Sequence, residues 1–335
     1  MTDGAHMSWR GRRVLVTGAD GFIGSHLAER LLELGSEVRA FCFYNSNGSL
    51  GWLDGAPRAR QEMDLRLGDI RDARFVEECC RDVDCVFHLA ALIAIPFSYQ
   101  APQSFVDTNV NGTLNVLEAA RRAGCRRVVH TSTSEVYGTP ERTPITEDHP
   151  LQGQSPYSAT KIAADKLCEA YHRSFGVPVV VLRPFNTYGP RQSMRAVLPT
   201  ILVQLLAGRE EVQLGRLDPK RDLTFVSDTV DGFVRAGKVE GVEGRVIQLG
   251  TGETHSIGEL FEAACRVLGV RARVVEEADR LRPDASEVLV LQSDPGRARE
   301  LLGWRSEVDL EQGLRLTARW VEEHLHRFDP ARYQV

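Results

Sequence analysis

The sequence of 335 residues lacks the long apolar runs that cross membranes, and it has no large excess of either charge. Its longest mostly apolar stretch, Cys85–Phe97, has about half of the roughly 20 residues that a membrane helix needs, and it contains His88 and Pro96. We therefore expect no membrane span, no membrane partner and no signal peptide. The 41 Lys and Arg residues nearly balance the 46 Asp and Glu residues, for a formal net charge of −5. This balance argues against a nucleic-acid partner.

The seven cysteines show no C-x-x-C spacing, which makes a zinc site or a redox pair of thiols unexpected. Their number is odd and includes the adjacent Cys79 and Cys80, so we expect reduced thiols in a cytoplasmic protein, with no metal. Lysine is also scarce, so a motif that requires it seldom arises by chance. The four lysines are Lys161, Lys166, Lys220 and Lys238.

From Arg12 onward, short β-branched runs alternate with stretches of helical periodicity, which is typical of α/β proteins with a parallel sheet between helices. The expected strands are Val14–Thr17, Val38–Phe43, Asp64–Gly68, Cys85–Ala90, Arg127–Ser132 and Val177–Arg183. The expected helices of this part are Gly21–Leu34, Ser104–Ala123 and Pro156–Phe175. We therefore predict a doubly wound parallel sheet, the Rossmann arrangement.

After Pro184 the alternation becomes irregular, which indicates a smaller C-terminal α/β region that binds the substrate. Ser256 with Glu259, and Asp309 with Gln312, have the spacing of capping boxes, and the last helix is expected over residues 310–328. We assign residues 10–185, plus about 222–250, to a dinucleotide-binding domain. Residues 186–221 and 251–330 form the second domain, which should pack directly on the first and leave a cleft.

A glycine loop follows the first expected strand and opens the first helix. Gly18, Gly21 and Gly24 have the spacing G-x-x-G-x-x-G. Glycine at these points permits a tight turn, close approach of the backbone to a pyrophosphate, and close packing of helix on strand, with the helix N-terminus facing the phosphates. The context of strand, loop and helix therefore predicts dinucleotide binding.

The second strand lacks the acidic residue that usually binds the adenosine ribose of NAD, because residues 42–45 contain no carboxylate. Asn45 or Ser46 would then contact the ribose, whereas Arg39 would accept the 2′-phosphate of NADP. The missing carboxylate therefore does not decide between NAD and NADP. Asp69, after the third strand, either meets the adenine amino group or caps a turn.

Tyr157 and Lys161 lie four residues apart, and therefore on one face of a helix. A lysine ammonium near a phenol favours the phenolate and lowers the tyrosine pKa from about 10. Such a tyrosine can take a proton from a sugar hydroxyl while hydride leaves for a nicotinamide. The expected strand 127–132 ends in the hydroxyl cluster Thr131–Ser134, followed by Glu135, at the sheet edge where ligands bind.

Six ordered motifs cover nearly the whole chain and resemble those of the extended short-chain dehydrogenase/reductases that act on nucleotide sugars. They are the glycine loop, His88–Ala91, Asn109–Thr113, the Tyr157/Lys161 pair, Arg183–Pro190 and Arg221–Val226. This resemblance implies NAD as cofactor, with NADP as the less favoured alternative. The implied cofactor-binding residues are Gly18, Gly21, Phe22, Ile23, Gly24, Asn45, Asp69, Ile70, Leu89, Ala90, Ala91, Asn109, Thr131, Tyr157, Lys161 and Pro184.

In that family the reaction begins with oxidation at C4 of the hexose. A 4-ketone acidifies the C5 hydrogen, so a 4,6-dehydratase uses a carboxylate, here Glu135, to remove it while the C6 hydroxyl leaves as water. The resemblance places Thr133, Ser134, Glu135, Tyr157 and Lys161 in the catalytic group. Related dehydratases carry an aspartate acid where this chain has Ser134, so the acid role would pass to Glu135 or through Ser134 and water.

The segments 43–46, 149–157, 189–193 and 282–288 resemble N-acetylhexosamine 4,6-dehydratases of legionaminic-acid-type pathways, and we favour this reaction. A 4-epimerase is the first alternative. A UDP-glucuronate decarboxylase is the second, since decarboxylases share the sequence of Ser132–Gly138. A non-catalytic NAD-binding regulator is a remote alternative. The sequence names neither the nucleobase nor the sugar.

The family positions that hold a nucleotide-diphosphate sugar are matched by Ser132, Asn186, Arg191, Arg221 and Arg282. Guanidinium groups suit a diphosphate, since their forked donors pair with phosphate oxygens. The helices expected over 104–123 and 156–175 correspond to those that form a four-helix dimer interface in the family. The resemblance therefore implies a homodimer.

Overall fold

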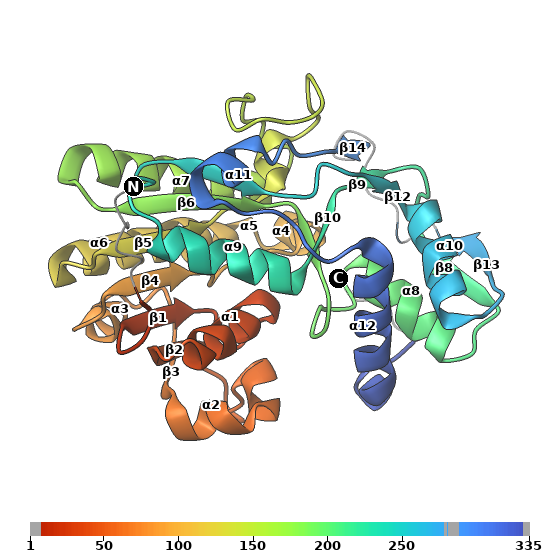
Figure 1. Cartoon of the computed structure of the whole chain (residues 1–335), viewed down its shortest axis with the longest axis horizontal. Helices are drawn as coiled ribbons and strands as arrows, with labels where there is room; N and C mark the ends of the chain where they lie inside the picture. The colour runs from red at the N-terminus through yellow and green to blue at the C-terminus, as the bar shows by residue number, and fades with distance from the viewer. Residues whose placement is uncertain (1–7, 278–279, 281–287, 331–335) are drawn as a thin grey trace, which may run out of the picture.

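The central sheet has seven parallel strands in the order β11-β6-β5-β4-β1-β2-β3 (Figure 1). The computed structural model of the chain describes residues 8–277, 280 and 288–330. The strands are β1 Arg13–Thr17, β2 Glu37–Phe43, β3 Asp64–Gly68, β4 Cys85–His88, β5 Arg127–Thr131, β6 Val179–Pro184 and β11 Val246–Leu249. This arrangement confirms the predicted doubly wound fold.

Helices cover both faces of the sheet because successive strand residues point to opposite sides. The helices of one face are α1 Phe22–Glu33 and α9 Val226–Lys238, and those of the other are α3 Ala73–Cys80, α6 Gly112–Ala123 and α7 Pro156–Phe175. Val16 of β1 belongs to the apolar cluster that contains Leu27 and Phe233. Its neighbour Leu15 belongs to the opposite cluster, with Val76 and Val116.

The C-terminal region is built from short strands and helices, as its irregular pattern predicts. Its strands are β7 Asn186–Tyr188 paired with β10 Leu223–Phe225, β9 Lys220–Arg221 between β12 His255–Ser256 and β14 Val290–Leu291, and β8 Glu211–Leu214 paired with β13 Arg273–Glu276. Its helices are α8 Val197–Leu206, α10 Ile257–Leu268, α11 Gly296–Leu302 and α12 Leu310–Glu323, followed by the single turn η6 Leu325–Arg327. Ser256 and Glu259 form the predicted reciprocal capping box of α10.

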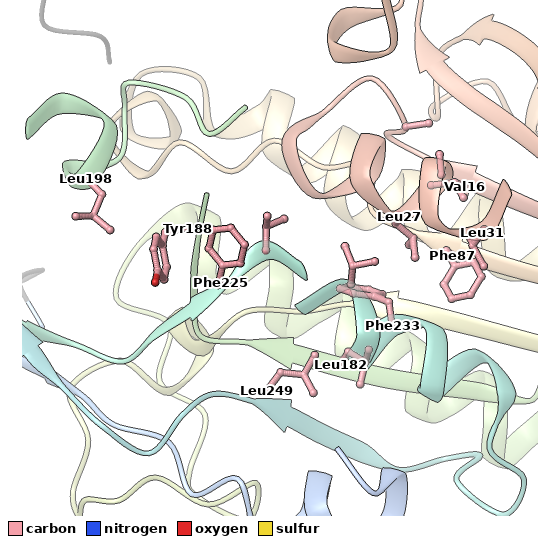
Figure 2. Close-up of a cluster of buried hydrophobic side chains, with 14 of the residues drawn as sticks. Val16, Leu27, Leu31, Phe87, Leu182, Tyr188, Leu198, Phe225, Phe233 and Leu249 are labelled. Carbon is pink, nitrogen blue, oxygen red and sulfur yellow. The ribbon is translucent and has the colours of Figure 1, made fainter. Parts of the chain in front are cut away.

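One apolar cluster joins the two regions. Figure 2 shows Leu182 and Leu249 of the sheet near Phe233, and Tyr188 and Phe225 farther along, toward the helix that carries Leu198. These side chains are all buried in the same continuous cluster. The C-terminal region therefore packs directly against the rest of the chain through this cluster.

Three elements differ from the sequence prediction. The seventh strand, β11, was not among the six expected strands, and β4 ends at His88 rather than Ala90. Beyond His88, the Leu89 amide donates to both the carbonyl and the hydroxyl of Thr17, the last residue of β1. The last helix ends at Glu323, where His324 leaves helical geometry with φ −116°. The third strand has the predicted bounds, and the boundaries of the other strands differ by at most two residues.

The predicted helix over 104–123 contains a π-helical segment. It consists of α5 Pro102–Phe105, the π-helix η2 Val106–Asn111, and α6. A π segment changes the direction of the side chains on a helix, and such segments occur often at functional sites. Here it accompanies the burial of Asn109, whose amide contacts two other elements described below.

The remaining short elements are η1 Gly51–Gly55, α2 Pro57–Glu62, α4 Ile95–Gln100 and η3 Ser134–Tyr137. All seven cysteines are free thiols. Within the described residues, none of the helices is both long and apolar enough to traverse a bilayer.

Candidate active site

The turn from β1 to α1 is a backbone cradle that only glycine can form. Gly18 has φ +69°, and a Cβ at this position would lie 2.9 Å from the Ala90 amide nitrogen. A Cβ at Gly24 would lie 2.0 Å from the Gly18 carbonyl oxygen. Helix α1 begins after Gly21 with no side-chain cap, so the first amides, including those of Phe22 and Ile23, are not claimed by a capping side chain. This geometry fits a dinucleotide pyrophosphate.

A hydrogen-bond chain fixes the end of β4 beside the cradle. Thr17 Oγ1 accepts from the amides of Leu89 and Ala90, both at 3.1 Å, so its own proton goes to His88 Nδ1 at 2.9 Å. His88 Nε2 then donates to Thr113 Oγ1 at 3.0 Å. We infer this tautomer from the donor and acceptor pattern. Burial lowers the pKa of His88 well below 6.5, so it is a neutral structural residue.

Asn109 connects the loop after β4 to α7. Its Oδ1 accepts from the Leu92 amide at 2.8 Å, while its Nδ2 donates to the Leu92 carbonyl at 2.9 Å and to Thr160 Oγ1 at 3.0 Å. Both amide protons are therefore used within the protein. The predicted cofactor residue Ala91 lies in this loop, one residue before Leu92.

The residues expected around adenosine are mostly engaged in internal contacts. Asn45 Nδ2 donates to the carbonyls of Phe43 and Ser49, and its Oδ1 accepts from the amides of Asn47 and Ser49. The Asn45 side chain therefore bonds within its own loop, and its contact with a ribose stays a prediction.

Arg39 and Asp69, two charged side chains considered for cofactor binding, are both paired within the protein. Arg39 donates to Asp64 at 2.7 Å and to the carbonyls of Cys79 and Arg81, so its guanidinium is not poised for a 2′-phosphate as expected. Asp69 accepts from the amide and guanidinium of Arg71, and this pairing lowers the pKa of Asp69.

The next predicted residue, Ile70, lies against α6. A Cβ on Gly112 would lie 2.8 Å from an Ile70 methyl carbon. The Ile70 carbonyl accepts from Asn115 Nδ2 at 3.1 Å.

Tyr157 and Lys161 occupy the first turns of α7, which a reciprocal Ser155/Ser158 capping box begins. Lys161 is buried, and its ammonium donates to the Thr131 carbonyl at 2.6 Å. Burial raises the pKa of Tyr157, the Thr133 side chain opposes this rise through a hydrogen bond, and the charge of Glu135 adds to it.

The expected lowering of the Tyr157 pKa by the Lys161 charge is therefore not the largest effect on that pKa. Lys161 is anchored to the strand end, and desolvation of the phenol has the larger effect. The two side chains nevertheless share one helix face. The phenol also packs edge-on against Phe105, with ring centroids 6.2 Å apart.

The hydroxyl cluster after β5 leads to Glu135. Thr133 caps the turn η3, and its Oγ1 accepts from the Glu135 amide at 3.2 Å. Ser134 is buried and Glu135 half-buried. Glu135 is near enough to Tyr157 to affect its ionisation, and its carboxylate makes no hydrogen bond or ion pair within the described part of the chain. The structure thus brings an unpaired carboxylate and a tyrosine to one place.

A buried charge network lies behind the cluster, and the sequence reasoning missed it. Asp165 Oδ2 accepts from Ser132 Oγ at 2.8 Å and from Arg183 Nη2 at 2.9 Å. Burial by itself would raise the pKa of Asp165, but His130, Arg183 and Ser132 lower it to about 2. The i, i+4 spacing of Lys161 and Asp165 was the available signal.

Two of the predicted residues, Thr131 and Ser132, lie beside this network. The Ser132 hydroxyl points to Asp165, whereas Thr131 Oγ1 is buried with no partner among the described residues. Arg183 also donates to Tyr137, whose hydroxyl donates to Gln248 of β11. The end of β5 is therefore supported from α7, β6 and β11.

The predicted substrate residues lie at the junction of the two regions. Asn186 follows Pro184 and Phe185, and its Oδ1 is buried without a hydrogen-bond partner in the described chain. Arg221 is buried on β9 and donates to the Lys220 carbonyl at 3.0 Å. Arg282 lies outside the described residues.

Arg191 projects elsewhere than the resemblance implies. Its backbone has φ +72°, and its guanidinium pairs with Glu29 and donates to Ser25 Oγ, both on α1. In this structure Arg191 thus attaches the loop after β7 to the helix that begins at the glycine cradle. His26, on the same helix, contacts the Pro190 carbonyl at 3.0 Å.

Within the described residues, no group of three or more His, Cys, Asp or Glu side chains is arranged to hold a metal ion.

Comparisons with known proteins show the family. A family model described as GDP-mannose 4,6 dehydratase matches residues 15–317. The chain is 37% identical over 310 residues to a UDP-glucose 4-epimerase of Mycolicibacterium smegmatis, covering 91% of this chain and 97% of that protein. It is 36% identical over 324 residues to a dTDP-glucose 4,6-dehydratase of Streptomyces griseus, covering 95% and 96%.

Solved structures are similar over the same length. A dTDP-glucose 4,6-dehydratase of Streptomyces venezuelae, solved with NAD bound, has a TM-score of 0.81 and 33% identity, covering 96% of this chain and all of that one. Proteins named UDP-glucuronic acid decarboxylase are also among the relatives. The similar proteins therefore include all three reaction types.

Proposed function

The chain belongs to the family of the GDP-mannose 4,6 dehydratase model, within the extended short-chain dehydrogenase/reductases that act on nucleotide sugars, and we propose that it is a nucleotide-sugar 4,6-dehydratase. The observation that carries this proposal is the Glu135 carboxylate, half-buried, without a described partner, and close enough to Tyr157 to affect its ionisation. A 4-epimerase has no need for such a base.

The cofactor that fits the cradle is NAD. The glycine turn suits a pyrophosphate, Arg39 is engaged with Asp64, and the Streptomyces venezuelae relative is solved with NAD. When bound, NAD supplies hydride acceptance from C4 and hydride return to C6. We assign binding of its phosphates to the amides around Gly21 to Gly24. Thr131 Oγ1, which is buried and without a described partner, is one polar atom left for the cofactor or the sugar.

Tyr157 takes the proton from the C4 hydroxyl as the C4–H bond breaks. Lys161 holds the end of β5 in place through the Thr131 carbonyl and keeps positive charge near the site. Burial of the phenol means that its pKa must fall when the reacting groups are assembled. The ionisation of Tyr157 is therefore coupled to binding.

Glu135 then removes the C5 proton, which the 4-ketone has made acidic. Loss of the C6 hydroxyl needs one proton, and Glu135 can return the proton that it has taken, directly or through Ser134 and water. Return of the hydride to C6 leaves C5 to be protonated, and the proton that Tyr157 took from the C4 hydroxyl restores this hydrogen, within the site or by exchange with solvent. Proton and electron counts then balance, with the loss of one water. No external reductant is needed.

A 4-epimerase is the second candidate, favoured by Ser134. An aspartate at this position is the dedicated acid of related dehydratases, and this chain has a serine there. The Mycolicibacterium smegmatis relative supports the same alternative. The decarboxylase alternative is supported by relatives and by the sequence Ser132–Gly138 that decarboxylases share. A non-catalytic regulator is disfavoured because Tyr157 and Lys161 are both present and share one helix face.

We retain the finer proposals on resemblance. The substrate is an N-acetylhexosamine linked to a nucleoside diphosphate, as in legionaminic-acid-type pathways, held by Asn186, Arg221 and Arg282, with Arg191 at the edge of the site. The protein is a cytoplasmic homodimer that associates through α6 and α7. Sedimentation of the purified protein tests whether it is a dimer.

The test is a comparison of Glu135→Gln with the wild type on a panel of UDP-, GDP- and dTDP-linked hexoses, N-acetylhexosamines and glucuronate. The variant should still oxidise C4, which is seen as the absorbance of the reduced cofactor, NADH. It should release almost no dehydrated sugar. Glu141→Gln removes the same charge from an exposed site six residues away and should behave as wild type. Undiminished dehydration by Glu135→Gln would remove Glu135 from the mechanism.

A further inference from the structure

The end of β2 has no acidic side chain, and Asn45, one of the two residues expected to contact the ribose, is bonded to its own loop. Residues 42–45 contain no carboxylate, and all four hydrogen bonds of the Asn45 side chain go to its own loop. In folds of this type a carboxylate at this place commonly binds the adenosine ribose hydroxyls. The strand that usually supplies this carboxylate therefore supplies none here.

A carboxylate from a different element reaches this place. Asp20 belongs to the glycine turn, and the amides of Gly18 and Ala19 tie that turn to the Phe41 carbonyl of β2. The Asp20 carboxylate accepts from the Phe43 amide, the last residue of β2, with Oδ2 3.3 Å from the nitrogen. Its charge lies at the strand end where an acidic residue of β2 would otherwise project.

The surroundings hold Asp20 in this position. The Trp52 amide donates to the Asp20 carbonyl at 3.1 Å. Gly51 packs so closely that a Cβ there would lie 2.4 Å from the same carbonyl oxygen. Burial raises the pKa of the Asp20 carboxyl, and hydrogen bonds from backbone amides partly oppose this rise. A carboxylate has about four acceptor positions, so Asp20 has capacity for two further donors.

We propose that Asp20 binds the 2′- and 3′-hydroxyls of the adenosine ribose, in place of an acidic residue on β2, and thereby selects NAD over NADP. This inference rests on the proposed use of a nicotinamide dinucleotide. The 2′-phosphate of NADP would bring negative charge against the Asp20 carboxylate. Arg39 does not compensate, because it is bound to Asp64 near the other end of the strand.

The experiment equilibrates the purified protein with equal concentrations of NAD and NADP, then releases and quantifies the bound cofactor. Wild type should carry almost only NAD. Asp20→Asn keeps an oxygen for the Phe43 amide but loses the charge, so the ratio of bound NAD to bound NADP should fall about 10-fold or more. Glu37→Gln, an exposed acid at the start of β2, is the matched control and should keep the wild-type ratio.

A second measurement needs no variant. Wild type should bind 2′-deoxy-NAD about 10-fold more weakly than NAD, because one hydroxyl donor to Asp20 is missing. Trp52 adjoins Asp20, so tryptophan fluorescence can follow binding. If Asp20→Asn keeps the wild-type ratio, or wild type binds both forms equally, the inference is wrong although the proposed function stands. Failure of wild type to bind any of the dinucleotides would instead overturn the proposed function.

Discussion

Replacing Asp165 by asparagine should destabilise the protein, because it leaves the buried Arg183 guanidinium without its counter-charge. Both side chains are 4% exposed, and Asp165 Oδ2 accepts from Arg183 Nε and Nη2 and from Ser132 Oγ. Breaking a buried ion pair by removing one partner costs about 3–5 kcal/mol. Asparagine keeps an acceptor oxygen, which places the expected loss near the lower end, about 3 kcal/mol.

The depressed pKa gives an independent estimate of the same quantity. A folded pKa of about 2, against 3.8 for the free side chain, corresponds to about 2 kcal/mol of stabilisation. Because the folded pKa is depressed, this contribution is present above pH 3.8 and is lost as the pH falls through about 2. The difference in stability between wild type and Asp165→Asn should therefore narrow over that interval.

Thermal and urea unfolding, followed by circular dichroism from neutral to acidic pH, measure this difference. At neutral pH we expect a melting temperature lower by roughly 5 °C. Asp231→Asn removes an exposed carboxylate that pairs with Arg235 four residues on, and should change stability by less than about 1 kcal/mol. A melting temperature of Asp165→Asn equal to that of Asp231→Asn, at all pH values, would refute the reasoning.

Two further predictions concern the glycine cradle and a helix cap. Gly24→Ala places a methyl group 2.0 Å from the Gly18 carbonyl oxygen, so the amount of NAD retained through purification should fall roughly tenfold. Gly258→Ala is the control, because its nearest neighbours lie 3.8 Å away, and it should retain NAD as wild type does. Equal retention in the two variants would show that the close approach at Gly24 is unimportant. Ser256→Ala removes one half of the capping box with Glu259 and should cost about 1 kcal/mol by urea unfolding while leaving turnover intact, and an unchanged midpoint would contradict this.

The fold was largely predictable because its signals are local. Five of the first six strands are short apolar or β-branched runs, and the third alternates leucine with charged residues. Gly18 to Gly24 lie within seven residues of sequence. The seventh strand, Val246–Leu249, has the same type of pattern, but it lies in a segment punctuated by irregular elements. Its place beside β6 is a tertiary contact that no local pattern specifies.

The sequence could propose residues for the candidate site but could not predict their contacts. Periodicity placed Tyr157 and Lys161 on one face, but the burial that controls the pKa of Tyr157 comes from elements far away in sequence. The π-helix around Asn109 depends on partners at positions 92 and 160. The pairing of Arg191 with α1 crosses more than 160 residues. Such long-range contacts require the folded chain.

The most direct test of the central claim uses a nucleotide-linked hexose or N-acetylhexosamine that carries deuterium at C4. Dehydration predicts a product lighter by one water, with the deuterium now at C6, because the hydride taken from C4 returns within the same site. Mass spectrometry gives the loss and proton NMR gives the position of the label. A product of unchanged mass, with deuterium back at C4 in an inverted sugar, would contradict the proposal and identify a 4-epimerase.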